Sequence, residues 1–357
     1  MGKRILIIAP YPPESAPSQR FRFEQYLPFL KEQGYEITVK PFLSQKGWDT
    51  LYKEGSTIAK VMTLSGSFMR RWGLMLTLSK YDHIFIHREA SMVGPAVFEW
   101  IIAKIFRRRF IYDFDDAIWL PNYSDSNARF QKLKMYKKVH KIMRLADTIT
   151  VGNTYLEEYA KQYNQNTQVI PTTIDTVHVH NLEGNSANDI PVIGWTGSHT
   201  TMQYLDDLIP VLDDLTVELK FKFRVISNQP MKVERDYLEF TPWNASTEIQ
   251  DLASINIGVM PLTDNEWSRG KCGFKALQYM ALGIPAVVSP VGVNTTIITH
   301  GENGFICGNR SEWKNVLSNL LQDKNLRHSI GQKGKERVLN NYSVEANKKN
   351  YLKLFEK

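Results

Sequence analysis

A glycine-containing segment carries three cations within seven residues, a pattern suited to holding a diphosphate. Arg269, Lys271 and Lys275 are interleaved with Gly270 and Gly273, and the glycines precede a helical pattern. The amide groups and dipole at a helix N-terminus attract anions, and nearby cations add to that attraction. We predict that this segment cradles a diphosphate. The alternative interpretation is a capped helix with surface lysines.

A second backbone-rich loop follows the apolar run at 286–289, which is typical of a buried strand. The loop begins at Ser289 and ends at Gly292. In an open parallel sheet, ligands bind at the loops beyond the carboxyl ends of the strands. We therefore expect Gly292 to line the same site as Gly273.

Three carboxylates gather where a predicted strand at 110–114 ends. Because side chains alternate along a strand, Asp113 and Asp115 lie on the face opposite to Phe114, with Asp116 next in the chain. We predict that Asp115 or Asp116 is catalytic, since a carboxylate can accept a proton from an acceptor hydroxyl or orient a sugar. The alternative is an acidic loop tied to Arg88 or to lysines.

Candidate acceptor contacts follow two other elements of the first half. His87 and Arg88 come directly after a predicted strand at 83–86 and face the same sheet edge as the carboxylates. Arg20 and Arg22 lie near the start of the first helix, where guanidinium groups can hold an acceptor phosphate. The alternatives are a buried structural histidine for His87 and a solvated helix face for the two arginines.

These residues depend on elements that alternate between short apolar runs and helical patterns, as in parallel sheets with crossover helices. In the first half the predicted strands are 5–9, 37–40, 83–86, 110–114, 148–151 and 168–170. The predicted helices are 18–33, 91–106, 128–145 and 153–162.

A polar, turn-rich segment at 181–189 is the predicted linker, after which the same alternation restarts. There the predicted strands are 192–195, 220–226, 238–241, 255–260, 286–289 and 305–307. The predicted helices are 201–213, 247–253, 273–282, 311–322 and much of 325–357. We predict an α/β fold of two Rossmann-like, doubly wound domains, 1–180 and 190–341, facing across a cleft that holds the active site.

Composition narrows the class of protein. At roughly 150 residues per domain, 357 residues correspond to about two domains. The 43% hydrophobic and 23% charged content excludes a disordered or collagen-like chain. Cys272 and Cys307 cannot form a disulfide framework, and His178 and His180 have no third ligand nearby, so we expect neither a metal nor a cofactor.

The N-terminal apolar run at 5–9 is too short for a signal-peptide core, and no segment reaches the length of a membrane span. We therefore expect a cytoplasmic protein that is soluble or peripheral.

The net charge of +7 is unevenly distributed. Residues 1–175 carry 25 Lys and Arg against 17 Asp and Glu, whereas 176–357 carry 19 against 20. Much of the excess lies in Arg107–Arg109 and in an amphipathic pattern from Arg129 to Arg144. One interpretation of that pattern is the solvated face of a packed helix, and another is a surface attracted to anionic lipid at about 1 kcal/mol per basic side chain. Nucleic acid is disfavoured because no base-stacking module or recognition helix accompanies the charge.

The run from Tyr279 to Gly292, together with His300 to Phe305, closely resembles the donor-binding segment of family 4 glycosyltransferases. The resemblance extends over most of the chain and is most specific in the second half. It implies a GT-B fold, with a terminal helix at about 342–357 crossing back to the first domain. It also implies metal-independent transfer of a sugar from a nucleotide-diphosphate donor with retention of anomeric configuration.

The chain departs from the family pattern at several donor positions. Gly270 and Gln278 occupy the places of two glutamates, of which the second contacts the nucleotide ribose; an amide can still hydrogen-bond ribose hydroxyls. An arginine and a lysine usual in the family are also absent, which leaves the Gly197 and Ser198 amides to assist Arg269 and Lys271. Trp243 lies where nucleobase contacts fall in the family, with a core tryptophan as the alternative.

The expected function is that of a retaining hexosyltransferase, with a nucleotide-diphosphate sugar as substrate and a glycan or lipid-linked acceptor in surface polysaccharide assembly. A possible partner is an anionic membrane at the inner face; nucleic acid is not expected. Two rival functions stay open. One is a sugar-nucleotide epimerase of the same fold, and the other is a degenerate transferase that acts as a binding partner.

Overall fold

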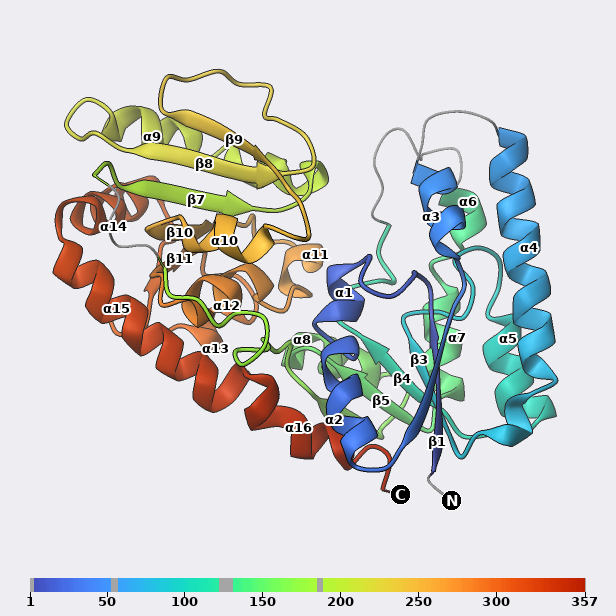
Figure 1. Cartoon of the computed structure of the whole chain (residues 1–357). Helices are drawn as coiled ribbons and strands as arrows, with labels where there is room; N and C mark the ends of the chain where they lie inside the picture. The colour runs from blue at the N-terminus through green and yellow to red at the C-terminus, as the bar shows by residue number, and fades with distance from the viewer. Residues whose placement is uncertain (1–2, 53–56, 122–130, 185–188, 357) are drawn as a thin grey trace. The chain divides into compact units, whose positions relative to one another are not determined.

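The computed structural model of the chain describes residues 3–52, 57–121, 131–184 and 189–356, which form two compact units (Figure 1). Unit 1 comprises Met1–Pro171 and Lys348–Lys357, and unit 2 comprises Thr172–Asn347. The division therefore falls ahead of the polar segment 181–189, of which 185–188 lie outside the described residues. The end of the chain belongs to the same unit as its beginning.

Unit 1 is built on a six-stranded parallel sheet with the order β2-β1-β3-β4-β5-β6. Its strands are β1 Arg4–Ala9, β2 Glu36–Pro41, β3 His83–His87, β4 Ile111–Phe114, β5 Thr148–Val151 and β6 Thr167–Val169. From β1 the chain goes to β2 at one edge of the sheet, and then it crosses back to β3 on the other side of β1. Such a reversal places a ligand-binding crevice at the carboxyl ends of β1 and β3.

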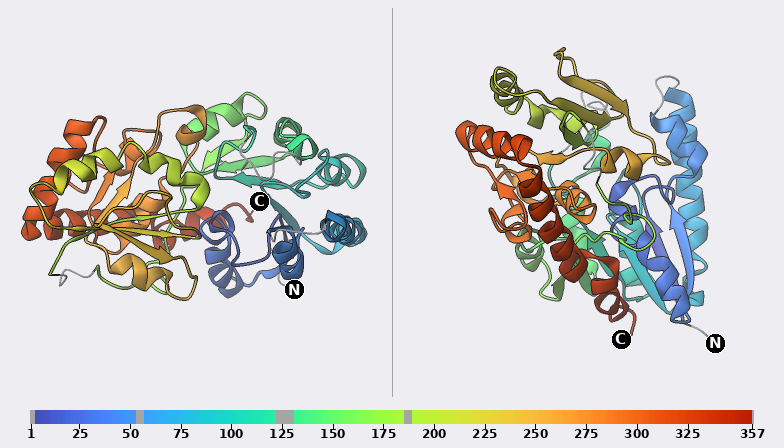
Figure 2. Two further views of the ribbon diagram at one scale, coloured as in Figure 1. Left: turned by 90° about the horizontal axis from the view of Figure 1, so that it is seen from above. Right: turned by 60° about the vertical axis from the view of Figure 1, so that its left-hand side comes forward.

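Helices cover both faces of this sheet (Figures 1 and 2). On one face, Tyr26 stacks on Tyr351 of the terminal helix with ring centroids 4.1 Å apart, which ties the end of the chain to unit 1. The elements of unit 1 are α1 Pro17–Arg20, η1 Glu24–Tyr26, α2 Leu27–Glu32, α3 Gln45–Tyr52, α4 Thr57–Met75, η2 Leu78–Lys80, α5 Val97–Trp100, η3 Ile101–Ile105, α6 Gln131–Lys134, α7 Lys138–Leu145 and α8 Thr154–Lys161. Helix α16, Val344–Leu352, begins in unit 2 and ends in unit 1.

Unit 2 contains a second six-stranded parallel sheet, with the order β12-β11-β10-β7-β8-β9. Its strands are β7 Val192–Thr196, β8 Lys222–Ser227, β9 Leu238–Pro242, β10 Ile257–Met260, β11 Ala286–Val288 and β12 Phe305–Ile306. The strand order reverses between β7 and β10, as in dinucleotide-binding sheets. The loops after these two strands therefore flank the expected ligand crevice of unit 2.

The helices of unit 2 pack against this sheet through a continuous core, in which Trp195, Phe223 and Leu317 are almost fully buried. These elements are η5 His199–Leu205, α9 Ile209–Leu215, α10 Glu248–Ala253, α11 Glu266–Arg269, α12 Phe274–Ala281, α13 Asn294–Ile297, α14 Arg310–Gln322, α15 Lys324–Arg337 and η6 Val338–Tyr342. A bridge between Ile174 and Ser343 joins the two ends of the unit.

The predicted α/β class with two doubly wound sheets is confirmed, and each predicted strand is present within two residues of its predicted bounds. The strands were readable because parallel sheets are buried on both faces, which produces near-continuous apolar runs.

Several helix predictions were wrong in extent. The helix expected at 18–33 is divided into α1, η1 and α2, and α2 restarts with a proline in its first turn. The helix expected at 91–106 is confined to 97–105 and ends as a π-helical turn. The helix expected at 128–145 is broken at Met135, whose φ of +50° no α-helix accommodates; residues 128–130 lie outside the described residues.

Helices α3 and α4 were missed altogether. The prediction left the chain between the strands at 37–40 and 83–86 without any element, although structureless connections of that length are rare in compact domains. The missed helix α4 has large apolar side chains on its exposed side as well as its buried side, which obscures the usual two-sided pattern.

Candidate functional site

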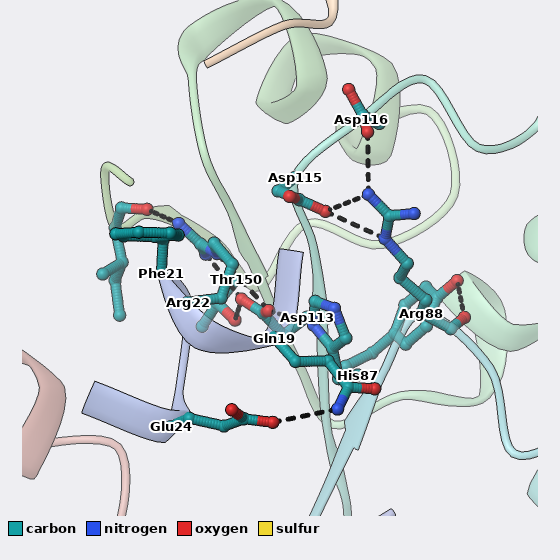
Figure 3. A network of polar contacts seen from close by, with 12 residues as sticks. Gln19, Phe21, Arg22, Glu24, His87, Arg88, Asp113, Asp115, Asp116 and Thr150 are labelled. Atoms are coloured by element: carbon teal, nitrogen blue, oxygen red, sulfur yellow. Dashed lines mark hydrogen bonds and ion pairs between the residues drawn. The ribbon is translucent and has the colours of Figure 1, made fainter. Parts of the chain in front are cut away.

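At the carboxyl edge of unit 1, Arg88 joins the two carboxylates that follow β4 (Figure 3). Its Nε and Nη2 donate to Asp115 Oδ1 at 2.9 and 2.7 Å, and Nη2 also donates to Asp116 Oδ2 at 2.7 Å. The three side chains are 14–23% exposed, so the cluster is partly open to solvent. The alternative interpretation of these carboxylates, an acidic loop tied to Arg88, describes the contacts present in this structure.

Two backbone contacts hold Arg88 in place. Its φ of +57° is unusual for a residue other than glycine, and its amide donates to Asp113 O at 2.7 Å while its carbonyl accepts from the Tyr112 hydroxyl at 2.8 Å. Burial by itself would lower the pKa of Arg88, but Asp115 and Asp116 raise it well above its ordinary value. Arg88 is therefore a fixed cation at the mouth of the unit 1 crevice.

Beneath this cluster, Asp113 forms the centre of a fully buried ionic network. Its carboxylate accepts from Arg22 Nη2 at 2.5 Å and from Thr150 Oγ1 at 2.7 Å, and it lies 2.8 Å from His87 Nδ1. Burial acts to raise the pKa of Asp113, but Arg22 and His87 lower it well below its usual value. Asp113 is thus ionised and fully partnered, and it belongs to the interior.

This network corrects the expected roles of His87 and Arg22. His87 is 0% exposed, so it cannot contact an acceptor in this structure and is the buried structural histidine of the alternative interpretation. Arg22 is 2% exposed and is held by Asp113 and by the carbonyl of Ile170, so it cannot hold an acceptor phosphate. Both residues are near the carboxyl edge of the sheet, but their side chains point inward to Asp113. A buried, ionised carboxylate requires such hydrogen-bonding and charged partners. Arg20 is half-buried, with its guanidinium 5.1 Å from the ring centroid of Phe21.

Tyr11, in the loop after β1, and Gln19, in α1, were not predicted as site residues. The Gln19 side chain bonds both the amide and the carbonyl of Tyr11, at 2.9 and 3.0 Å, which shapes the loop. The Tyr11 ring packs edge-on against Trp48, and burial raises the pKa of Tyr11 while the neighbouring Arg88 opposes that shift. Tyr11 and Arg88 therefore meet where the sheet order reverses. The proline-rich loop directly after the first strand was the sequence feature that could have pointed to this part of the site.

In unit 2, Gly273 forms the N-terminal cap of α12 in the left-handed conformation, with φ +68°. A Cβ at this position would lie 2.2 Å from Ile297 Cδ1, so only glycine allows the backbone to pass here. Helix α12 then continues under the sheet, and its Tyr279 hydroxyl accepts from the Thr196 amide at the end of β7 at 3.1 Å. The helix N-terminus is thereby fixed at the carboxyl edge of the sheet.

Gly292 brings the loop after β11 against the same segment. Its φ is +55°, and a Cβ there would lie 2.8 Å from the carbonyl oxygen of Arg269. The Arg269 guanidinium forms a two-pronged ion pair with Asp264, at 2.7 and 3.0 Å. This pairing with Arg269 lowers the pKa of Asp264. Asp264 was not singled out in the sequence, where it precedes the cationic segment by five residues.

The two lysines of the segment lie against tryptophan rings. Lys271 Nζ is 5.5 Å from the Trp267 ring centroid, and Lys275 Nζ is 5.4 Å from that of Trp195. Cation–π contacts of this kind contribute about 0.5–1 kcal/mol at exposed sites, less than the ~1.5–3 kcal/mol of a hydrogen bond to a charged group. An arriving diphosphate can therefore draw both ammonium groups away from the rings.

The Trp195 ring also approaches Gly197, where a Cβ would lie 2.6 Å from the ring. The Gly197 amide donates to Ile226 O at 3.1 Å and is already used in the sheet, which corrects its expected role as a diphosphate donor. The neighbouring Ser198 places its hydroxyl 2.8 Å from Thr200 Oγ1 at the start of η5.

The predicted ribose contact is also engaged inside unit 2. Gln278 is 1% exposed, and its Nε2 lies 3.3 Å from His180 Nε2 and 3.5 Å from Glu248 Oε1. His180 and Glu248 were missed as its neighbours because they are distant in sequence. Trp243, 37% exposed after β9, is on the surface as a base-flanking ring requires.

A cavity of about 550 Å³ in unit 2, lined in part by Ser289 and Asp264, was not predicted. Its charged lining residues are Asp206, Asp207, Asp264 and Arg310, so it is negative overall and less suited to a diphosphate than the cationic segment is. Among the residues that the structure describes, no His, Cys, Asp and Glu cluster could hold a metal ion. In the same residues, no helix is both long and apolar enough to cross a bilayer.

Comparison with known proteins supports this geometry. Residues 190–323 match the model of the family described as Glycosyl transferases group 1. A curated relative, N-acetyl-alpha-D-glucosaminyl L-malate synthase of Bacillus anthracis, is 29% identical over 75 residues, which span 20% of each chain.

Solved structures of the same fold cover nearly the whole chain. Sucrose-phosphate synthase from Thermosynechococcus elongatus has a TM-score of 0.71 at 13% identity, over 99% of this chain and 98% of that one. Anabaena HepE in complex with UDP-glucose has a TM-score of 0.66 at 15% identity, over 98% of each chain.

The two doubly wound sheets define the class of fold, GT-B, and residues 190–323 are similar to the family described as Glycosyl transferases group 1. These matches agree with the resemblance to family 4 glycosyltransferases carried by the run from Tyr279 to Gly292.

Proposed function

We propose that the protein transfers a hexose from a nucleotide-diphosphate sugar to an acceptor hydroxyl with retention and without a metal ion. The observation that carries this proposal is the glycine-capped start of α12, beside Arg269, Lys271 and Lys275, inside the segment that matches the family. Departure of a nucleoside diphosphate builds negative charge on the leaving group. Amides and cations placed in advance stabilise that charge in the transition state.

The roles of the individual groups follow from this charge. The start of α12 and the three cations bind the diphosphate, and Trp243 flanks the base. Because Gly292 has no side chain, the backbone of the loop after β11 can approach the phosphates closely. With retention, the leaving diphosphate accepts the proton of the acceptor hydroxyl on the same face of the sugar. The HepE structure contains UDP-glucose, so uridine is the first donor nucleoside to test here.

We assign acceptor binding to unit 1, at the edge occupied by Arg88, Asp115 and Asp116. Arg88 holds both carboxylates in a fixed orientation, and carboxylate oxygens are acceptors suited to sugar hydroxyls. Arg20 supplies a further cation on the first helix for an anionic acceptor. Because Asp113 is buried and paired with Arg22, the catalytic carboxylates of this proposal are Asp115 and Asp116.

The acceptor we propose is a glycan or lipid-linked precursor of a surface polysaccharide, which places the enzyme in the cytoplasm at the inner membrane face. Unit 1 carries 29 Lys and Arg against 17 Asp and Glu, a charge that favours an anionic surface.

The test is a double variant, Arg269→Ala with Lys271→Ala, assayed for transfer from UDP-sugars. Removing two preorganised cations should reduce turnover by at least about 10²-fold. The matched control is Lys324→Ala with Lys333→Ala, which removes the same charge from exposed positions of α15 and should change turnover by less than about twofold. Equal rates in the two double variants would exclude Arg269 and Lys271 from the mechanism.

Product analysis separates the two rival functions. An epimerase would convert the nucleotide sugar without an acceptor, whereas a degenerate transferase, motivated by Gly270 and Gln278 at the glutamate positions, would bind UDP without releasing it from UDP-sugars. Acceptor-dependent release of UDP excludes both.

A further inference from the structure

Helix α4 lies at the outer side of unit 1 (Figure 1), and large apolar side chains near both of its ends are exposed to solvent. Met69 is 70% exposed and Leu76, just past the helix end, is 82% exposed. The spacing of three or four residues places them on one side of the helix. We call this surface the α4 face; it consists of Ile58, Val61, Met62, Met69, Trp72 and Leu76.

Most of the α4 face takes no part in attaching the helix to its unit; the exception is Trp72, which is half exposed and packs edge-on against Phe98. Helix α4 is anchored through its other side, where Ser67, Arg71 and Leu74 are buried and Phe68 lies 6.0 Å from the Phe98 ring of α5. The Arg71 guanidinium donates to the carbonyls of β2 and β1, at Lys40 and Ala9. Apart from Trp72, the exposed apolar stripe is therefore additional to the packing of the fold.

The charge around the α4 face is uniformly positive in the sequence. No Asp or Glu occurs from Gly55 to Tyr81, a stretch that contains Lys60, Arg70 and Lys80. The end of η3 and the two residues after it have a similar composition, with exposed Lys104, Ile105, Phe106 and Arg107. The edge-on contact of Trp72 with Phe98, at 5.1 Å, packs α4 against α5, the helix that leads into η3.

We infer that the α4 face docks on an anionic lipid bilayer, with its apolar side chains among the acyl chains and the flanking cations at the headgroups. An apolar helix side flanked by basic residues is the composition that lies in a membrane interface. Each cation near an anionic leaflet adds to the attraction, and the stretch from Gly55 to Tyr81 has no carboxylate to oppose it.

The amphipathic pattern from Arg129 to Arg144 does not offer an equivalent surface. In α7, Val139, Ile142 and Met143 are 0–3% exposed within unit 1, and Lys138 is buried in an ion pair with Glu89 at 2.9 Å. Before α7, Leu133 and Met135 are 53% and 48% exposed, a smaller apolar surface than the six residues of the α4 face. The predicted lipid surface therefore moves from this segment to α4.

A second copy of the chain is a less suitable occupant than lipid. A 19-residue helix is about 28 Å long and about 10 Å wide, so its outward side offers about 300 Å², compared with about 800 Å² per partner in a stable interface. A bilayer requires no such matched area, since the surrounding cations supply the rest of the attraction.

This inference rests on the proposed function only in its purpose, which is to bring the enzyme to a lipid-linked acceptor. Its test uses vesicles without donor or acceptor. Failure of vesicle binding would leave the transferase assay unaffected, and an inactive enzyme that still binds vesicles would leave the docking surface standing.

The experiment is flotation of the full chain with vesicles of phosphatidylcholine alone or with phosphatidylglycerol, at low and high salt. We expect binding to the anionic vesicles that weakens with salt, and a loss of affinity of about tenfold or more in Met69→Glu with Leu76→Glu. The matched control is Val217→Glu with Leu339→Glu, which places the same charges on exposed apolar positions of unit 2 and should bind as the wild type does. Thermal unfolding of both double variants should match the wild type, because all four side chains are exposed.

A wild-type chain that fails to float with anionic vesicles overturns the inference, as does equal binding by the two double variants. Sedimentation that shows a dimer lost in Met69→Glu with Leu76→Glu, without vesicle binding, also overturns it and assigns the α4 face to a second copy. Quenching of tryptophan fluorescence by brominated acyl chains, reduced in Trp72→Phe, would place α4 itself in the bilayer; undiminished quenching in that variant contradicts this.

Discussion

The two units share one architecture but treat charge at their carboxyl edges in opposite ways. In unit 1, Arg88 and Arg22 are each bound to carboxylates of the strand β4 or the residues after it, and the Arg22 pair is fully buried. In unit 2, the cations lie on aromatic rings or in a half-exposed pair, next to glycines that leave the backbone accessible. The net charges also differ, at +12 for unit 1 and −5 for unit 2.

This difference separates a rigid edge from an adaptable one. Buried ion pairs with several hydrogen bonds are costly to break, so unit 1 holds its carboxylates in fixed positions. An exposed ion pair such as that of Arg269 with Asp264 contributes little, so Arg269 can exchange its partner for a diphosphate at small cost. Unit 2 is negative overall, and its capacity for an anion depends on a few local cations and amides rather than on net charge.

The largest expected effect tests the rigid edge. The variant Asp113→Asn removes the carboxylate that pairs with the buried Arg22 and should lower the free energy of unfolding of unit 1 by about 3–5 kcal/mol. The matched control is Asp147→Asn, whose exposed pair with Arg109 should contribute less than about 1 kcal/mol. Denaturant titration of both variants measures the comparison, and equal losses would show that the network is not rigid.

The same variant predicts a pH dependence. Because the pKa of Asp113 is lower in the folded protein than its ordinary value of about 3.9, its stabilising contribution is present above that value and is lost as the pH falls below it. The stability difference between wild type and Asp113→Asn should therefore be constant from pH 5 to 7 and shrink below about pH 4. A difference that persists undiminished at acid pH would contradict an ionised Asp113.

The next effect tests the close backbone approach in unit 2. Both Gly292 and Gly301 have positive φ, so an alanine at either position should cost about 1–2 kcal/mol of unfolding free energy. Only Gly292 has a neighbour in the way, the Arg269 backbone, so Gly292→Ala should cost more than Gly301→Ala and should also weaken UDP binding. Thermal shift with and without UDP measures both effects. Unchanged UDP binding in Gly292→Ala would remove this loop from the donor site.

The smallest effect tests the adaptable edge. Asp264→Asn removes the carboxylate that pairs with Arg269 at a surface position, so the unfolding temperature should hardly change. The affinity for UDP should rise a fewfold, because the guanidinium is released to the diphosphate and a nearby negative charge is lost. Calorimetric titration with UDP measures this change, with Asp214→Asn, partner of Arg310, as the control. A lower affinity in Asp264→Asn would mean that Asp264 orients Arg269 instead of competing for it.

The sequence by itself determined the sheets and the glycine-lined loops. The strand at 5–9 is a continuous apolar run, and Gly273 and Gly292 have positive φ in the structure, a conformation that glycine adopts without strain. Local information sufficed because a buried strand and a left-handed glycine each restrict their own residue types. The three cations at 269–275 could likewise be recognised from their close spacing in the sequence.

Only the tertiary structure decided which polar groups are engaged. Arg22, His87 and Asp113 come from three elements far apart in the chain, and they become one buried network because the parallel register places His87 beside Asp113. Helix α4 was unreadable for a related reason, since the direction of its exposed side depends on what packs against it. A side chain's partner and exposure are properties of the assembled core, which no local pattern of residues encodes.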